Sequence, residues 1–417
     1  MEAIRKLIEA HKDAEVFLVG GAVRDVMLGR ELTDIDLVVR EIPAEDLKTF
    51  LGRHGAVDLV GTRFGVFKFR PKRGGHVIDI ALPRTEAAGG SGRYRDFAVQ
   101  MDPHLPIESD LGRRDFTINA MAWDFRASKL VDPYGGRADL ERRQLRAVGA
   151  PTDRFEEDAA RIFRALRFAI QLGFTIEPST WHAIVDGIAR LGNRIVAPEA
   201  LAKEFLKSIA ADPARATDLW KQAGALKRLM PELVEHDAEA LARLGSEKFR
   251  KRFPHYPSID VVLAILLYPL GDAVAGDIIR RLRLSSVERF DASAERVTWI
   301  IRHFEEPFRR HPDELPPSRV QRLLFDRQYR GTDLLMASAA ITEAPYLKAW
   351  MQVEELVPLV DGKTVMQLTG RLGGPDIGQI LAHLMDLQGR GTLTSSAEAE
   401  AYLKEHGHDP TFPHPLR

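Results

Sequence analysis

The stretch that decides the fold reads FLVGGAVRD at residues 17–25 and is followed by DID at residues 34–36. The apolar residues at its start predict a strand, and Gly20 and Gly21 predict a tight turn before a helix. Glycines at this point let a phosphate group approach the backbone, while the start of the helix directs free N–H groups toward it. The segment therefore predicts a triphosphate-binding turn, to which Arg24 adds a positive charge.

The second part of this stretch predicts a metal site. On a strand, alternating side chains place Asp34 and Asp36 on one face, with Ile35 packed behind them. Two carboxylates on one face suit a pair of Mg²⁺ ions, which activate an attacking 3′-hydroxyl and stabilise a leaving pyrophosphate. A third acid is expected from a neighbouring strand, and Asp79 lies in a suitably alternating segment at residues 76–80. The pattern is typical of polymerase-type chemistry.

The acid doublet is a weak motif when it is taken alone. With 60 acidic residues in 417, roughly nine acid-x-acid triplets are expected by chance. A Gly-Gly pair at one fixed distance from such a doublet is expected only about 0.05 times. The combination of the two parts therefore carries the interpretation.

The composition is that of a soluble globular protein of two to four domains, with 45% hydrophobic and 29% charged residues among 417. A formal net charge of -1 does not by itself indicate a nucleic-acid partner. The absence of cysteine excludes disulfides and thiolate metal sites. Residues 1–12 lack the apolar core of a signal peptide, and the longest apolar run, 259–270, is too short for a bilayer. We expect no membrane segment and a cytoplasmic protein.

The pattern beyond the opening stretch predicts an α+β head followed by helices. Short strands separated by Gly and Pro turns indicate a mixed sheet with helices on one side. A glycine-containing loop is expected over residues 84–110, and a helix is expected to begin at Arg114 and Asp115. Beyond residue 136 helical periodicity dominates, starting with a long helix over 155–172.

Four blocks in a fixed order resemble one known family. Besides the opening stretch, they are residues 61–67 with 77–81, the segment DLGRRDFTINAMA at 110–122, and RFEEDAARIFRALRF at 154–168. These blocks are similar to the class II tRNA nucleotidyltransferases, the CCA-adding enzymes, and to the bacterial poly(A) polymerases. The resemblance is dense over residues 15–175 and looser at residues 362–381.

The resemblance implies a fold, an activity and partners. The fold would be a nucleotidyltransferase head at residues 1–136, a helical neck at 137–205, a helical body at 206–310 and a helical tail at 311–417. The activity would be Mg²⁺-dependent addition of CCA from CTP and ATP to a tRNA 3′ end, with release of pyrophosphate. The tRNA would be held by its 3′ end and its acceptor and T arm.

A base-reading role is expected for Asp158 and Arg161, which are three residues apart on the predicted helix. An aspartate offers acceptors and an arginine offers donors, so together they suit the Watson–Crick edges of cytosine and adenine. Arg164 and Arg167 continue at three-residue steps and drift around the helix toward the triphosphate. For an isolated helix, a solvated arginine face would be the simpler interpretation.

The resemblance also implies roles for Arg114 and for the residues near it. Arg114 would contact the nucleotide, and Asp115 would help to recognise the ribose hydroxyls. Arg84 and Glu86 would open a loop that assists the change from C to A addition. Three alternatives remain open at this point: partial enzymes that add only A or only CC, a bacterial poly(A) polymerase, and a non-catalytic RNA-binding adaptor.

Overall fold

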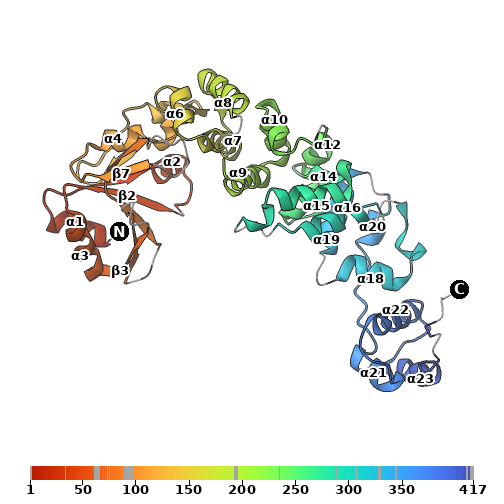
Figure 1. The fold of residues 1–417 in the computed structure, drawn as a ribbon. Coiled ribbons are helices and arrows are strands. Elements are labelled where there is room, and N and C mark those ends of the chain that lie inside the picture. The colour runs from red at the N-terminus through yellow and green to blue at the C-terminus, as the bar shows by residue number, and fades with distance from the viewer. Residues whose placement is uncertain are drawn as a thin grey trace. The chain divides into compact units, whose positions relative to one another are not determined.

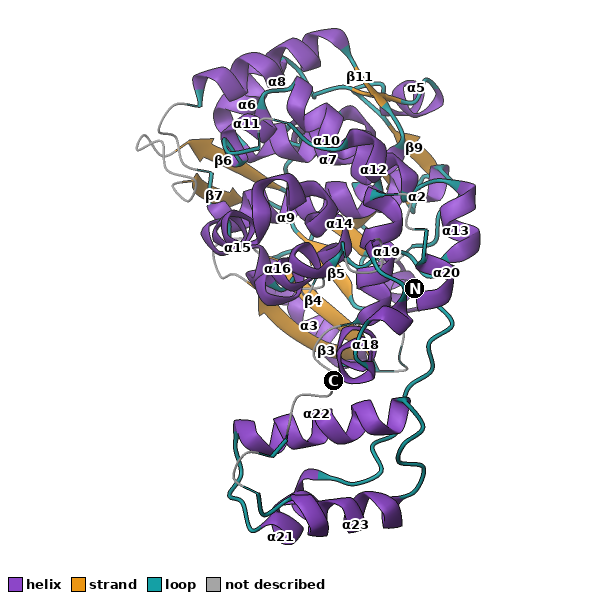
Figure 2. Cartoon of the chain, turned by 90° about the vertical axis from the view of Figure 1, so that its right-hand side faces the viewer, coloured by secondary structure: helices purple, strands orange, loops and turns teal. Residues whose placement is uncertain are grey.

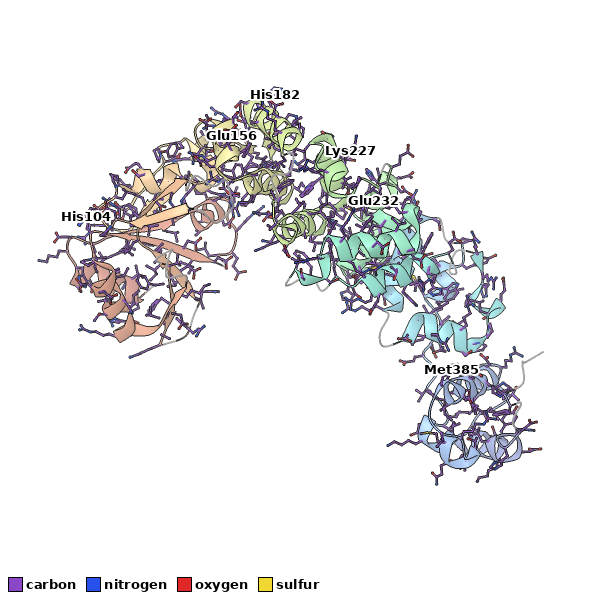
Figure 3. The ribbon with its side chains drawn as sticks, viewed as in Figure 1. His104, Glu156, His182, Lys227, Glu232 and Met385 are labelled. Carbon is purple, nitrogen blue, oxygen red and sulfur yellow. The ribbon has the colours of Figure 1, made fainter. Side chains whose placement is uncertain are left out.

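The structure is a computed structural model of the 417-residue chain. It describes residues 2–413 except 33, 61–65, 73, 75, 89–96, 192–195, 234, 288–289, 291, 306–308, 327–329, 343–344 and 410–411. The chain forms two compact units, Met1–Leu226 and Lys227–Arg417; Lys227 is labelled in Figure 3. The predicted boundaries between head, neck, body and tail stay a prediction.

A seven-stranded sheet forms the centre of the first unit (Figure 1). Its strand order is β3-β4-β5-β2-β1-β8-β9; β2 and β5 are parallel, and the other neighbouring pairs are antiparallel. The predicted mixed sheet is therefore confirmed. The strands are β1 Glu15–Val19, β2 Ile35–Arg40, β3 Gly55–Val60, β4 Val66–Pro71, β5 Ile78–Ala81, β8 Ala122–Asp124 and β9 Lys129–Val131.

The sheet is covered on both faces, so the prediction of helices on one side was wrong. On one face, Ile35 and Leu37 of β2 pack in a core that includes α1 (Glu2–Ala10) and α3 (Ala44–His54). On the other face, Val38 packs with Leu111 of α4 (Ile107–Gly112). Because side chains alternate along a strand, Asp36 lies on the same face as Val38.

The remaining helices of the first unit differ from the prediction at three places. The helix expected over 155–172 is broken into α6 (Pro151–Glu157) and α7 (Ala160–Leu172). The loop expected over 84–110 contains an antiparallel pair of strands, β6 (Arg84–Ala88) and β7 (Phe97–Met101), and then α4. No helix begins at Arg114 and Asp115, which lie between α4 and the 3-10 helix η1 (Thr117–Asn119).

Helices then dominate, as predicted, apart from a two-residue parallel pairing of β10 (Gln144–Leu145) with β11 (Thr175–Ile176). The other helices of the first unit are α2 Gly21–Met27, α5 Gly136–Glu141, α8 Pro178–Arg190, α9 Pro198–Ala211 and α10 Pro213–Gln222, and α11 Ala225–Leu229 spans the division between the units. The strands of Figure 2 all belong to this unit.

The described residues of the second unit form helices, turns and connecting segments. The helices are α12 Ala238–Arg243, α13 Glu247–Arg252, α14 Ile259–Leu267, α15 Gly271–Arg281, α16 Ala294–His303, α18 Pro317–Phe325, α19 Gly331–Ile341, α20 Leu347–Trp350, α21 Gly362–Thr369, α22 Pro375–Gly389 and α23 Ser396–His406. The last three share a core of their own and lie together in Figure 2.

One segment of the second unit, Ile259–Arg281, is long and apolar enough to cross a membrane by length and composition. Within it, every residue of α14 is buried among the helices of its own unit. Asp260 of α14 accepts hydrogen bonds from the Ser293 N–H and the Arg296 side chain. These are the features of a core helix of a globular unit.

Candidate active site

The glycine turn lies where the sequence predicted it. Gly20 directly precedes α2 and has φ of 70°, a backbone conformation that glycine adopts without a steric cost. A Cβ atom on Gly20 would lie 2.6 Å from Nη1 of Arg114 and 4.0 Å from Oδ2 of Asp36. The missing side chain thus makes room for a guanidinium and a carboxylate beside the turn.

Two of the three predicted acids, Asp36 and Asp79, lie side by side on one face of the sheet, and the charge of Asp34 reaches Asp36. Asp36 and Asp79 are register partners on the parallel strands β2 and β5, and Asp34 is exposed just before β2. Burial raises the pKa of Asp36 above its ordinary 3.8; the positive charges of Arg114 and Lys68 oppose this rise, and the negative charges of Asp79 and Asp34 add to it. Negative charge is therefore concentrated at this point of the sheet.

Asp79 is held by a lysine that the sequence did not single out. Lys68 is its register partner on β4, and the Lys68 Nζ atom lies 3.5 Å from Oδ1 of Asp79. Among the described residues, no three acidic or histidine side chains are grouped closely enough to hold a metal ion. Asp79 is thus paired to Lys68, and Asp34 and Asp36 as metal ligands stay a prediction.

Arg114 is anchored from α4. The carboxylate of Asp110, which is fully buried, accepts from Nη2 of Arg114 at 3.1 Å and from Nη2 of Arg113 at 2.6 Å. The Nε atom of Arg114 is buried and has no hydrogen-bond partner within the described part of the chain. The Nη1 atom of Arg114 lies beside Gly20, so the Asp110 carboxylate holds this guanidinium next to the turn.

The guanidinium of Arg24 points into the protein, where it donates to other side chains. Its Nε and Nη2 atoms donate to Asp25 at 2.9 and 2.8 Å, and its Nη1 atom donates to Oδ1 of Asn119 at 2.7 Å. The guanidinium also lies 5.3 Å from the centre of the Phe168 ring. Arg24 and Arg167 line a cavity of about 390 Å³ beside this ring.

Asp115 is buried and is bonded to α7. Its Oδ2 atom accepts from Nε and Nη2 of Arg164 at 2.9 and 2.6 Å, and its Oδ1 atom accepts from the Phe116 N–H and from Nδ2 of Asn119. Burial alone would raise the pKa of Asp115, but the charge of Arg164 and these hydrogen bonds lower it below 3.8. Asp115 therefore links the segment after α4 to the helix that carries Arg164.

The ion pair between Asp115 and Arg164 makes the stability of the first unit depend on pH. The lowered pKa means that the carboxylate of Asp115 stabilises the fold fully above pH 3.8, and that this contribution is lost as the pH falls through the folded-state value. Asp115→Asn should cost on the order of 1–3 kcal/mol at neutral pH. The difference from wild type, measured by urea unfolding, should shrink as the pH falls below 3.8. A difference that stays constant with pH would contradict the assignment.

Asp158 and Arg161 are neighbours, but their side chains are not paired with each other. Asp158 lies at the break between α6 and α7, where its Oδ1 atom accepts from the Ala160 N–H at 2.9 Å. Arg161 donates to Oε2 of Glu157 at 2.8 Å and to the carbonyl oxygen of Arg113 at 3.1 Å. In the described part of the chain the other carboxylate oxygen of Asp158 accepts no hydrogen bond and stays available.

Arg167 is the predicted site residue that is held most firmly by the protein. It is 6% exposed, its Nε atom bonds Oε2 of Glu204 on α9, and its guanidinium stacks 3.8 Å from the centre of the Phe168 ring. Burial lowers the pKa of Arg167. The arrangement is that of a helix-to-helix bond rather than of a free cation.

Sequence reasoning missed four residues that hold the predicted ones in place: Lys68, Asp110, Asn119 and Glu204. Two of them had a signal in the sequence. Asp110 lies four residues before Arg114, a spacing at which side chains of a helical turn meet, and Asn119 lies four residues after Asp115. Lys68 and Glu204 approach their partners only through strand pairing and helix packing.

Comparison with known proteins points to the same family as the sequence motifs. Residues 16–146 match the family described as the poly A polymerase head domain. A multifunctional CCA protein of Xylella fastidiosa (strain M12) is 41% identical over 221 residues, 52% of this chain and 50% of that protein. A CCA-adding enzyme of Pseudomonas putida (strain W619) is 38% identical over 264 residues, 62% of this chain and 66% of that protein. The chain thus spans about half the length of the first relative.

Solved structures extend the likeness of fold to the helical part. The CCA-adding enzyme of Bacillus stearothermophilus in complex with CTP has a TM-score of 0.70 at 24% identity, over 97% of this chain and 95% of that chain. The Thermotoga maritima CCA-adding enzyme complexed with tRNA has a TM-score of 0.65 at 23% identity, over 94% and 91%. At this identity the likeness concerns the fold.

The mixed sheet, the acids on its face and the glycine turn beside Arg114 define a nucleotidyltransferase-type head. The helical segments that follow the head have the same fold as in the solved structures. The chain is similar to the poly A polymerase head domain over residues 16–146, and to curated CCA-adding proteins over at least half of its length.

Proposed function

We propose that the protein adds C, C and A to the 3′ end of tRNA, using CTP and ATP and releasing pyrophosphate. The observation that carries the proposal is the acid pair Asp34 and Asp36 beside the turn at Gly20, which faces Arg114. The relatives that share this half of the chain are named as CCA-adding proteins, which supports tRNA as the acceptor. The cytoplasm is the proposed compartment.

Divalent metal ions are generally used by the family, and the residues present here fit Mg²⁺. The exposed carboxylate of Asp34 and the partly buried one of Asp36 are hard oxygen ligands, and the charge of Asp34 acts on Asp36. Mg²⁺ typically takes one or two carboxylates together with substrate phosphates. When bound, it would lower the pKa of the attacking 3′-hydroxyl and neutralise charge on the leaving pyrophosphate.

The triphosphate would lie against the turn at Gly20 and Gly21. There the first backbone N–H groups of α2, which no side chain caps, would donate to phosphate oxygens, as would the Nη1 atom of Arg114 beside Gly20. Arg24 would act mainly by supporting this region, because three of its N–H groups already bond Asp25 and Asn119. Arg164 and Arg167 would add positive potential behind the nucleotide.

The base would be recognised by Asp158 and Arg161. The available carboxylate oxygen of Asp158 would accept from the exocyclic amino group that cytosine and adenine share. Arg161 donates three hydrogen bonds to protein acceptors, so two of its five N–H groups are left for the ring acceptors of the base. One acid with an adjustable arginine would thus accept both bases and reject uracil and guanine, which carry a carbonyl at that position.

The products of the purified protein test the proposal. Two tRNA substrates, one lacking CCA and one ending in CC, would be incubated with Mg²⁺ and with CTP and ATP singly and together. The expected result is CC with CTP alone on the first substrate, A with ATP alone on the second, and CCA with both. Addition of A only, of CC only or of a long A tail would instead identify a partial enzyme or a poly(A) polymerase.

A further inference from the structure

A chain of buried hydrogen bonds connects α2 to α7 through one uncharged side chain, Asn119 of η1. Asn119 is 6% exposed. Its Oδ1 atom accepts from Nη1 of Arg24 at 2.7 Å, and its Nδ2 atom donates to Oδ1 of Asp115 at 3.0 Å. Asp115 in turn accepts two hydrogen bonds from Arg164. Two arginines on different helices are therefore joined through one amide and one carboxylate.

The amide of Asn119 can adopt only one orientation here. Arg24 has only donors and the carboxylate of Asp115 has only acceptors, so the oxygen must face Arg24 and the nitrogen must face Asp115. A flipped amide would place N–H groups against a guanidinium and an oxygen against a carboxylate. Both contacts are buried, where an unsatisfied group is costly. The position therefore needs a side chain that accepts a hydrogen bond on one side and donates one on the other, and aspartate, which has the same shape, cannot donate.

Asp115 has no acceptor capacity left for a ligand. A carboxylate has about four lone-pair positions, and those of Asp115 receive the Phe116 N–H, the Asn119 amide and two N–H groups of Arg164. Asp115 is 8% exposed, whereas 39% of the Arg164 side chain is exposed. The charge of Arg164 also interacts with that of Asp158. The accessible member of the pair is thus the arginine.

We propose that Asn119 is a positioning residue, which orients Arg24 directly and Arg164 through Asp115. The inference rests on the proposed function, because it takes this arginine-lined face as the place where a nucleoside triphosphate binds. Asn119 would then couple α2, beside the triphosphate turn, to α7, which carries the base-reading residue Arg161.

Asn119→Asp is the most informative substitution because it preserves shape and separates the two links. The new carboxylate still accepts from Arg24, but it has no donor for Asp115 and places a second negative charge against that buried carboxylate. Arg164 should then lose its fixed orientation. The dissociation constant for CTP, measured by calorimetry on the full chain with Mg²⁺, should rise about tenfold to a hundredfold.

Thr117→Val provides a matched control within the same 3-10 helix. The Oγ1 atom of Thr117 donates to Oδ2 of Asp139 at 2.6 Å, and both residues are buried. This variant loses a buried hydrogen bond of η1 without touching the connection between Arg24 and Asp115. The melting temperature should fall in both variants, but in Thr117→Val the dissociation constant for CTP should stay within about twofold of wild type.

A double variant separates positioning from a general loss of structure. If Asn119 acts through Arg164, Asn119→Asp combined with Arg164→Ala should bind CTP no more weakly than Arg164→Ala alone. Fully additive losses would overturn the inference. If Asn119→Asp does not fold, Asn119→Ser, which keeps a hydroxyl able to serve one of the two links, replaces it in the same cycle.

The outcomes distinguish this inference from the proposed function. A wild-type protein that binds no CTP overturns the proposed nucleotide site, and the inference with it. A wild-type protein that binds CTP, together with Asn119 and Thr117 variants that weaken binding equally, overturns the positioning role alone. Weak binding by the Asn119 variant, near-normal binding by the Thr117 variant and a non-additive double variant would support it.

Discussion

Asp36→Asn should reduce nucleotide incorporation by about a thousandfold or more while leaving the head folded. The change keeps the shape of the side chain and removes one of the two proposed metal ligands. Metal-assisted stabilisation of a transition state contributes several kcal/mol, and every 1.36 kcal/mol corresponds to a factor of ten in rate. Incorporation of labelled CMP into tRNA lacking CCA measures the effect.

The same variant should be at least as stable as the wild-type protein. Because burial raises the pKa of Asp36, the ionised carboxylate opposes folding at neutral pH, and a neutral amide removes that cost. Its melting temperature should therefore equal or exceed that of wild type, and its affinity for tRNA should be retained. Loss of activity accompanied by unfolding would contradict a direct role in the chemistry.

Asp46→Asn is the matched control for this substitution. Asp46 is an exposed acid in the first turn of α3, which packs on the opposite face of the sheet. The same chemical change there should leave incorporation unaltered and shift stability by no more than a few tenths of a kcal/mol. An equal loss of activity in both variants would indicate a general effect of charge.

Gly20→Ala is expected to reduce incorporation about tenfold to a hundredfold. The added Cβ would lie 2.6 Å from Nη1 of Arg114, so the guanidinium must move away from the triphosphate turn. One displaced charged hydrogen bond is typically worth about 1.5–3 kcal/mol. The positive φ of Gly20 adds a backbone cost of about 1–3 kcal/mol, which calorimetric unfolding measures separately.

Gly29→Ala serves as the control for the backbone cost. Gly29 follows the end of α2 and also has a positive φ of 66°, but no atom of the described residues lies within 4 Å of the place that its Cβ would take. The Gly29→Ala variant should lose stability and keep the wild-type KM for CTP. If Gly20→Ala changed only stability, to the same extent as Gly29→Ala, the proposed place of Arg114 beside the triphosphate would be wrong.

The opening stretch could be interpreted from the sequence because its signals are local. A strand, a glycine turn and a helix depend on neighbouring residues, and strand β1 and helix α2 flank the glycines as predicted. Alternation along a strand likewise places Asp34 and Asp36 on one face without knowledge of the partner strands. These are interactions over a few residues, which a pattern records directly.

Asp158 illustrates where local reasoning failed. The apolar spacing of residues 155–172 continues across this position and predicts a single helix. The helix ends there instead, with Asp158 in an extended conformation and its carboxylate bonded to the Ala160 N–H. Aspartate competes for backbone N–H groups with its own side chain, and this competition broke the helix.

The sequence by itself determined the class of fold, the glycine turn and the acid pair, because each follows from residues close together in the chain. Only the tertiary structure decided which groups stay accessible: Asp79 pairs with Lys68, Arg167 with Glu204, and Arg24 and Asp115 meet through Asn119. The pairs formed by Arg24, Asp79, Arg164 and Arg167 join residues far apart in the chain. Their hydrogen bonds depend on strand register and helix packing, which composition and periodicity do not encode. The acid pair, Asp34 and Asp36, therefore stays a prediction from the sequence, whereas the arginines around it are held in place by partners that only folding provides.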